Sequence, residues 1–161
     1  MDIKTIVLIL VAIIGAVSDW KYRKISNWLT FGVLVFSLSC GFINAGLTSL
    51  VNPILGFLTG ILILIIPYLF GGMGAGDVKL LGAVGSLVGV KNVIVIFFYS
   101  ALCGLCLGLI WLVFTPGHFK FFITTGKILP TVDKKQKVPY GVAIFMGTIL
   151  YIMLGTNKFP F

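Results

Sequence analysis

Acidic residues are nearly absent from this chain of 161 residues. It has no glutamate, four aspartates and one histidine, and charged residues make up 10% of the sequence. A soluble domain usually carries about 25% charged residues, so this chain lacks the side chains for an ordinary polar surface. Hydrophobic residues account for 59% of the sequence. This composition excludes a soluble globule, a disordered chain and a nucleic-acid-binding protein.

Long stretches of the chain carry no Asp, Glu, Lys or Arg. A membrane-spanning helix needs roughly 20 apolar residues, and turn-forming residues at 44–46 and 52–53 divide the longest stretch. We therefore expect an all-α integral membrane protein, a single domain over residues 1–161 that forms a bundle of about six transmembrane helices. The expected helices cover residues 3–19, 27–45, 51–70, 77–91, 93–114 and 138–155.

The basic residues predict the orientation of this bundle. Nine of the twelve lie on one side of the expected membrane: Lys21, Arg23, Lys24, Lys79, Lys120, Lys127, Lys134, Lys135 and Lys137. Because loops rich in Lys and Arg stay in the cytoplasm, we expect a multi-pass protein of the cytoplasmic (inner) membrane with both termini outside. The net charge of +8 then reflects topology, with the lipid bilayer and not nucleic acid as the partner. A signal peptide ending near residues 16–18 is an alternative, although its cleavage would spoil this asymmetry.

Two aspartates lie at the edges of expected helices. Asp19 closes the first apolar stretch and Asp77 opens the fourth, on the same side and at the same depth. An ionisable residue at the edge of a membrane helix is a candidate functional residue. Two carboxyls held close cannot both ionise cheaply, so such a pair can activate one water without a metal or cofactor. Alternatively, Asp19 is a surface charge beside the membrane and Asp77 caps a helix.

Glycines cluster immediately before Asp77. Four of the residues at 71–76 are glycines, which let a backbone turn sharply and let another chain approach closely. An extended peptide substrate needs such access. A surface of small residues for helix packing is the alternative. That alternative explains better the glycines farther along the same expected helix: Gly82, Gly85 and Gly89.

These motifs resemble those of a known family. Residues 74–82 (GAGDVKLLG) resemble the signature of the type IV prepilin peptidases, which are GxGD aspartyl proteases. The Asp19 segment, with Ile25 and Asn27 after it, is similar to the first catalytic motif, and residues 137–143 resemble the proline-containing segment that opens the last helix. The resemblance covers nearly the whole chain. It implies that Asp19 and Asp77 are the catalytic pair of an intramembrane-type aspartyl endopeptidase.

The resemblance also implies a substrate. An enzyme of this kind cleaves the basic leader peptide from prepilin-like or preflagellin-like membrane proteins at the cytoplasmic face. The chain is most similar to the short forms, such as tight-adherence (Flp-type) prepilin peptidases and archaeal preflagellin peptidases, which lack an N-terminal methyltransferase region. Peptidase activity without N-methylation is therefore expected. Ser26 stands where the family often has proline, which affects the shape of the loop and not the chemistry.

Further residues are expected to bind substrate or to shape the site. Two lysines follow the aspartates by two positions, a spacing that places them on a different helix face from the carboxylates. They are expected to extend to the membrane interface or to contact an acidic residue of the substrate. The proline-containing segment either shapes the site opening or simply starts a helix. The predicted set is Gly74, Gly76, Lys79, Lys21, Pro139, Tyr140 and Gly141.

Other functions are compatible with the same composition. Cys103 and Cys106 are expected to be buried small residues, because zinc would need more ligands than His118 supplies; no metal is therefore predicted. A small proton- or cation-coupled transporter could use the same two aspartates, although inverted repeats are lacking. A membrane assembly factor without chemistry is the third hypothesis.

Overall fold

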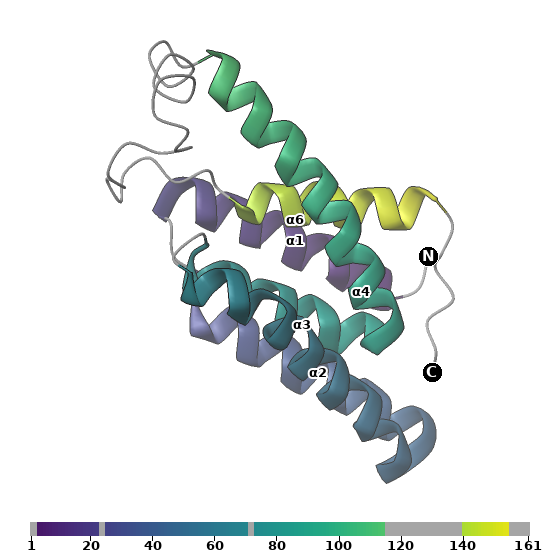
Figure 1. Cartoon of the computed structure of the whole chain (residues 1–161). Coiled ribbons are helices and arrows are strands. Elements are labelled where there is room, and N and C mark those ends of the chain that lie inside the picture. The colour runs from purple at the N-terminus through teal and green to yellow at the C-terminus, as the bar shows by residue number, and fades with distance from the viewer. Residues whose placement is uncertain (1–2, 23–24, 71–72, 115–139, 155–161) are drawn as a thin grey trace.

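The computed structural model describes residues 3–22, 25–70, 73–114 and 140–154, and this part of the chain is helical without a strand. Figure 1 shows the helices packed as one bundle. Their bounds are close to the expected ones, and those of α2 are identical. The elements are α1 (Ile3–Tyr22), α2 (Asn27–Ala45), the short 3₁₀ helix η1 (Gly46–Leu50), α3 (Val51–Leu69), α4 (Ala75–Phe114) and α6 (Tyr140–Met153).

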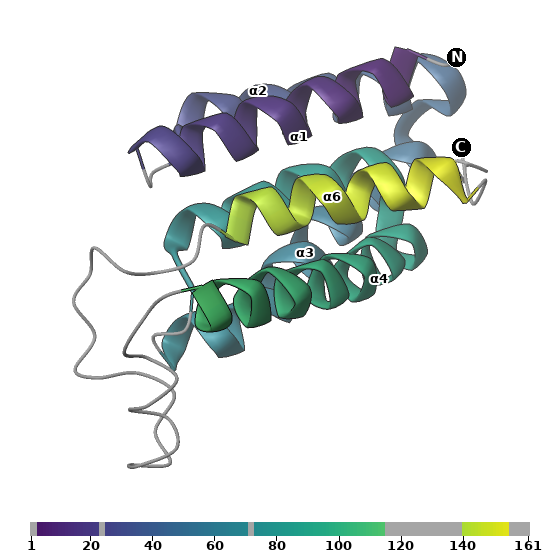
Figure 2. The same ribbon diagram turned by 90° about the horizontal axis from the view of Figure 1, so that it is seen from above.

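Helix α4 consists of two helices joined at a break. Gly89 has φ 80° and ψ 174°, a conformation that is essentially restricted to glycine. The chain reverses direction there, as Figures 1 and 2 show. Two helices were expected in this stretch, but the predicted boundary after residue 91 is wrong. The reversal occurs at the glycine, and the side chain of Asn92 donates a hydrogen bond of 3.0 Å to the carbonyl of Val88 across it.

The first half of α4, residues 75–88, is the centre of the bundle. Every residue from 77 to 88 is buried except Lys79. Three neighbouring helices enclose this half through close contacts. Leu80 fills the space beside Gly15 of α1, the hydroxyl of Ser37 of α2 donates to the carbonyl of Ser86, and the backbone of Gly85 meets Gly56 of α3.

Glycines allow α3 and α4 to approach backbone to backbone. A Cβ atom on Gly56 or on Gly85 would collide with the carbonyl oxygen of the other residue, and a Cβ on Gly60 would collide with the carbonyl of Leu81. A Cβ on Gly82 would lie 3.0 Å from the side chain of Ile61. The helix-packing alternative is therefore confirmed for Gly82 and Gly85. Gly89 belongs to the same contact and also forms the break.

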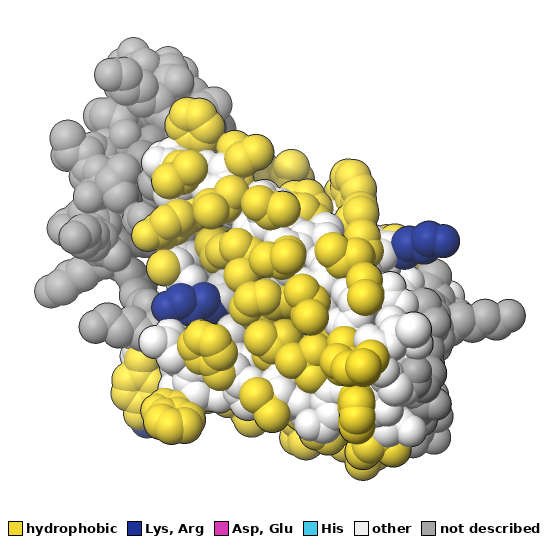
Figure 3. All heavy atoms as spheres, turned by 90° about the horizontal axis from the view of Figure 1, so that it is seen from below, with side chains coloured by type: hydrophobic (Ala, Val, Ile, Leu, Met, Phe, Trp, Pro, Cys, Tyr) yellow, Lys and Arg dark blue, Asp and Glu magenta, His cyan; other side chains and the backbone are white. Residues whose placement is uncertain are grey.

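The exterior of the bundle is apolar. Figure 3 shows hydrophobic side chains over most of one face. Three helices in the described part are long and apolar enough to cross a membrane, Ile3–Tyr22, Gly46–Leu69 and Ala75–Ile110, and α2 and α6 are shorter apolar helices. The chain is a multi-pass membrane protein, while six as the number of spans stays a prediction. Trp20 and Trp28 are exposed near the α1–α2 connection, a position typical of aromatic residues at a membrane interface.

Candidate active site

Asp19 lies inside α1, in its last turns, and is only 8% exposed. The backbone N–H of Gly141, at the start of α6, donates a hydrogen bond of 2.9 Å to its Oδ2 atom. A Cβ atom on Gly141 would lie 2.7 Å from the Cβ atom of Asp19. Glycine is therefore required at this position for α6 to begin directly against the carboxylate.

Asp77 lies in the first turn of α4 and is 4% exposed. Its Oδ2 accepts a hydrogen bond of 3.1 Å from the N–H of Gly74, and its own N–H donates to the Gly74 carbonyl at 3.2 Å. The bond from the Gly74 N–H to the Asp77 carboxylate is one of the two bonds of a helix capping box, with Asp77 as the third residue of α4. Asp77 therefore helps to cap the helix, although it is not the N-cap residue itself. This bond also fixes the carboxylate at a helix N-terminus, which favours negative charge.

The two aspartates lie at the same end of the bundle. Asp19 is bound by Gly141 in the first turn of α6, and Asp77 is bound by Gly74 immediately before α4. Figure 2 shows the end of α1 and the starts of α4 and α6 at the same end of the bundle. Within the described ranges, no other residue has a side-chain carboxylate, since Asp2 and Asp133 lie outside them. Both carboxylates of the described ranges therefore lie at one end of the bundle, each bound by a backbone N–H at the start of a helix.

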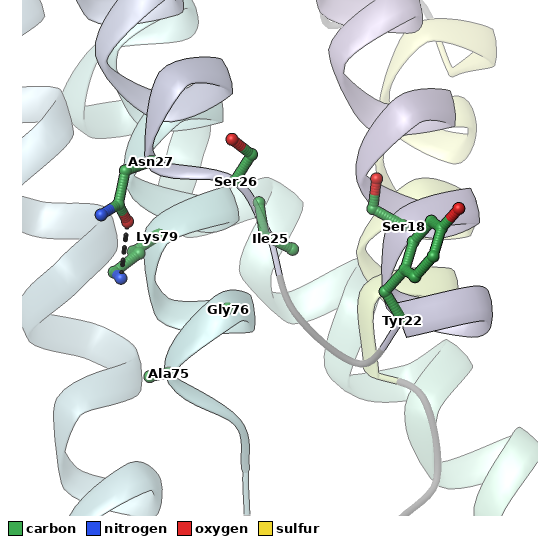
Figure 4. Close-up of a pocket in the computed structure, with 8 residues that line it drawn as sticks. All are labelled: Ser18, Tyr22, Ile25, Ser26, Asn27, Ala75, Gly76 and Lys79. Atoms are coloured by element: carbon green, nitrogen blue, oxygen red, sulfur yellow. Dashed lines mark hydrogen bonds between the residues drawn. The ribbon is translucent and has the colours of Figure 1, made fainter.

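A pocket of about 640 Å³ opens beside these residues. Figure 4 shows that it lies between the last turns of α1, the connection to α2 and the first turn of α4. Two of its lining residues, Ser18 and Gly76, directly precede the two aspartates in the sequence. The lining consists of Ser18, Tyr22, Ile25, Ser26, Asn27, Ala75, Gly76 and Lys79. The pocket presents hydroxyl, amide and ammonium groups, whereas the buried carboxylates of Asp19 and Asp77 do not themselves line it.

The other predicted site residues fall into two groups. Gly74 and Gly76 lie at the site, and a Cβ on Gly76 would be 3.1 Å from the side chain of Ile25. Lys79 lines the pocket. Lys21 does not line it: the side chain is exposed, with its ammonium 5.3 Å from the ring centroid of Tyr22. Pro139 lies outside the described residues.

The sequence did not indicate four polar side chains that line the pocket: Ser18, Tyr22, Ser26 and Asn27. Among them, Asn27 has a defined partner. In the structure its Oδ1 accepts a hydrogen bond of 2.9 Å from the ammonium of Lys79. The only available signal was its spacing from Asp19.

The cysteines do not form a metal site with other ligands in the part of the chain that the structure describes. No group of three His, Cys, Asp or Glu side chains comes together there. The expectation that Cys103 and Cys106 are both buried is wrong, because Cys103 is half-buried and Cys106 is exposed. The second half of α4 turns part of its surface away from the protein, which leaves Cys106 uncovered.

Comparison with known proteins identifies the family. Residues 6–109, which include both aspartates, match the type IV leader peptidase family. This chain belongs to that family. The prepilin leader peptidase/N-methyltransferase of Bacillus subtilis (strain 168) is 31% identical over 158 residues, which cover 97% of this chain and 57% of that protein. The chain thus spans little more than half the length of this relative. No solved structure matches the chain. Family membership favours the peptidase hypothesis over a transporter or an assembly factor.

Proposed function

We propose that this protein is an aspartyl endopeptidase that cleaves the basic leader peptide from prepilin-like membrane proteins, using Asp19 and Asp77. One observation carries the proposal. In a chain of the type IV leader peptidase family, two buried carboxylates are held by backbone N–H groups at the starts of α4 and α6, beside an open pocket. The named relative from Bacillus subtilis is a prepilin leader peptidase, which supports a substrate of the same class.

The chemistry requires one ionised and one protonated carboxyl. Two carboxylates held close cannot both keep a negative charge cheaply, so the pair holds one proton. The ionised carboxylate removes a proton from a water molecule, whose oxygen attacks the peptide carbonyl carbon. The protonated carboxyl donates its proton to the carbonyl oxygen. When the resulting tetrahedral intermediate collapses, the C–N bond breaks and the leaving nitrogen takes the proton that the first carboxylate had removed from water. A hydroxyl of the intermediate returns a proton to the second carboxylate, so the products are a free carboxyl and a free amine and the pair again holds one proton.

The position of the pair at the end of the bundle suits a membrane-inserted substrate. The apolar exterior can lie against a substrate helix in the bilayer, while the pocket receives the extended segment that leaves the membrane. Lys21 and Lys79 are both at this end of the bundle. By the positive-inside rule this end faces the cytoplasm, where a basic leader would also be held.

Neutralising either carboxylate tests the proposal. The substitutions Asp19→Asn and Asp77→Asn keep the side-chain size and remove the ionisable group. Each should lower the rate of leader removal by at least about 10³-fold, because a single carboxyl group cannot both accept the proton of the water and donate one to the peptide carbonyl. The measurement is the rate of leader cleavage from a co-expressed prepilin in membranes. Lys91→Gln, at an exposed position beyond the break in α4, is the matched control and should cleave at the wild-type rate. Full activity in either aspartate variant would contradict the mechanism.

A second arm of the same assay separates this mechanism from metal-dependent hydrolysis. Two carboxyls and a water suffice for the proton transfers, so addition of a strong chelator should leave the cleavage rate unchanged. A chelator that stops cleavage, with activity restored by a divalent metal, would exclude the proposed chemistry.

A further inference from the structure

A polar bridge crosses the rim of the pocket. The ammonium of Lys79, in the first half of α4, donates a hydrogen bond of 2.9 Å to Oδ1 of Asn27, the first residue of α2. Figure 4 shows this bond spanning the two helices. It joins residues that are 52 positions apart in the sequence. The two residues lie on different helices, so the bond is a tertiary contact between α2 and α4.

A second contact lies alongside this bridge. Ile25 is 6% exposed, and its backbone nitrogen and side chain press against Gly76, where a Cβ atom would lie 3.2 Å and 3.1 Å from them. The two contacts fall on either side of Asp77 in the sequence. Residues 25 and 26 lead directly into α2, which begins at Asn27. The two contacts therefore hold the start of α2 against the start of α4, which carries Asp77.

We propose that Asn27 and Lys79 are positioning residues, whose hydrogen bond holds residues 25–27 on the start of α4 and thereby fixes the orientation of Asp77 in the site. This inference rests on the proposed function. It assigns the Lys79 ammonium to an internal contact, and not to a charged group of the substrate.

Loss of this bond should affect catalysis more than it affects the stability of the whole protein. Asn27 is exposed, and an exposed hydrogen bond to a neutral amide contributes little to global stability, because water can replace it. Its loss should leave the buried packing between α3 and α4 intact. Catalysis is more sensitive, since reacting groups displaced by about 1 Å can lose on the order of 10²-fold in rate.

Two substitutions of Asn27 test this role. Asn27→Leu keeps the approximate size and removes the oxygen acceptor, whereas Asn27→Asp keeps an acceptor oxygen for Lys79. Asn27→Leu should lower kcat for leader cleavage about tenfold, with KM and the thermal unfolding temperature unchanged. Asn27→Asp should restore kcat. Lys79→Met should match Asn27→Leu, and the double variant should be no slower than either single variant, because both remove the same bond. Lys91→Met is the control for loss of a lysine outside the site.

The outcomes distinguish the positioning role from other roles of the same residues. Wild-type kcat in Asn27→Leu would overturn it. The role would also be overturned if Lys79→Met raised KM without lowering kcat and Asn27→Asp lowered the cleavage rate further. That pattern is expected of an ammonium that binds the substrate. If Asn27→Leu lowered the unfolding temperature enough to explain the lost activity, the bond would contribute to folding only, and the positioning role would be overturned. Cleavage that survives Asp77→Asn would overturn the proposed function itself, whereas cleavage lost in Asp77→Asn and unchanged in Asn27→Leu would overturn only the positioning role.

Discussion

The two halves of α4 are similarly apolar in sequence but differ in their surroundings. In the first half, residues 75–88, nearly every side chain beyond the first turn is buried among α1, α2 and α3. In the second half, residues 90–114, the large side chains of Phe98, Leu102 and Leu105 are about 60% exposed. Apolar residues in the first half are covered by protein. In the second half one side is buried, with Val93 and Ile96 in the core, and the other side faces outward. A charged group is tolerated where protein dipoles surround it, which is why the first half can begin with Asp77.

The largest effect of this difference should appear at Gly85, in the backbone contact between α3 and the first half of α4. Gly85→Leu forces a side chain into the carbonyl of Gly56, which belongs to a helix backbone and cannot move aside. We expect a loss of about 3 kcal/mol of unfolding free energy or failure to fold. The measurement is denaturant unfolding in detergent. Gly108→Leu, where no atom lies within 4 Å of a Cβ, is the control in the second half. Equal stability of the two variants would contradict the comparison.

A smaller effect, on activity, should appear where α6 meets the site. Gly141→Ala adds a methyl group 2.7 Å from the Cβ of Asp19 and 2.9 Å from its Oδ2. The carboxylate or the start of α6 must move, so we expect leader cleavage to fall roughly 100-fold, while the unfolding free energy falls by about 1 kcal/mol. Gly32→Ala, on an open face of α2, serves as the matched control. Unchanged cleavage would show that Asp19 does not need the Gly141 contact.

The smallest effect should come from the outward face. Leu102→Ala in the second half of α4 should change the unfolding free energy by less than about 0.5 kcal/mol, because the side chain is 62% exposed. The same substitution at Leu87, which is fully buried in the first half, should cost about 3 kcal/mol. The two variants are compared by unfolding in the same detergent. A larger loss at Leu102 than at Leu87 would mean that the second half is covered by protein, for example by another copy of the chain.

Much of this arrangement could be predicted from the sequence. The charge-free stretches predict the helices, and the resemblance points to Asp19 and Asp77, which the structure places at one end of the bundle. The break in α4 comes earlier than the sequence predicts, because Gly89 is one of several glycines at helix-packing spacing and sequence alone does not indicate which adopts a positive φ. The Asn27–Lys79 bond joins positions far apart in the sequence, so no local pattern predicts it. Lys21 is exposed and does not line the pocket, which shows that the two-residue spacing from an aspartate does not by itself bring a lysine into the pocket.

The central claim is that Asp19 and Asp77 act as one unit beside the start of α6, and chemical bridging in membranes tests it most directly. In a chain whose Cys40, Cys103 and Cys106 are replaced by serine, thiols introduced by Asp19→Cys and Asp77→Cys are treated with a short bifunctional thiol reagent. Asn27→Cys with Lys79→Cys, whose native side chains are in contact, is the positive control, and Asp19→Cys with Lys91→Cys is the negative control. We predict rapid bridging of the aspartate positions, comparable to that of the positive control. Absence of bridging there, with the positive control bridged, would contradict the account.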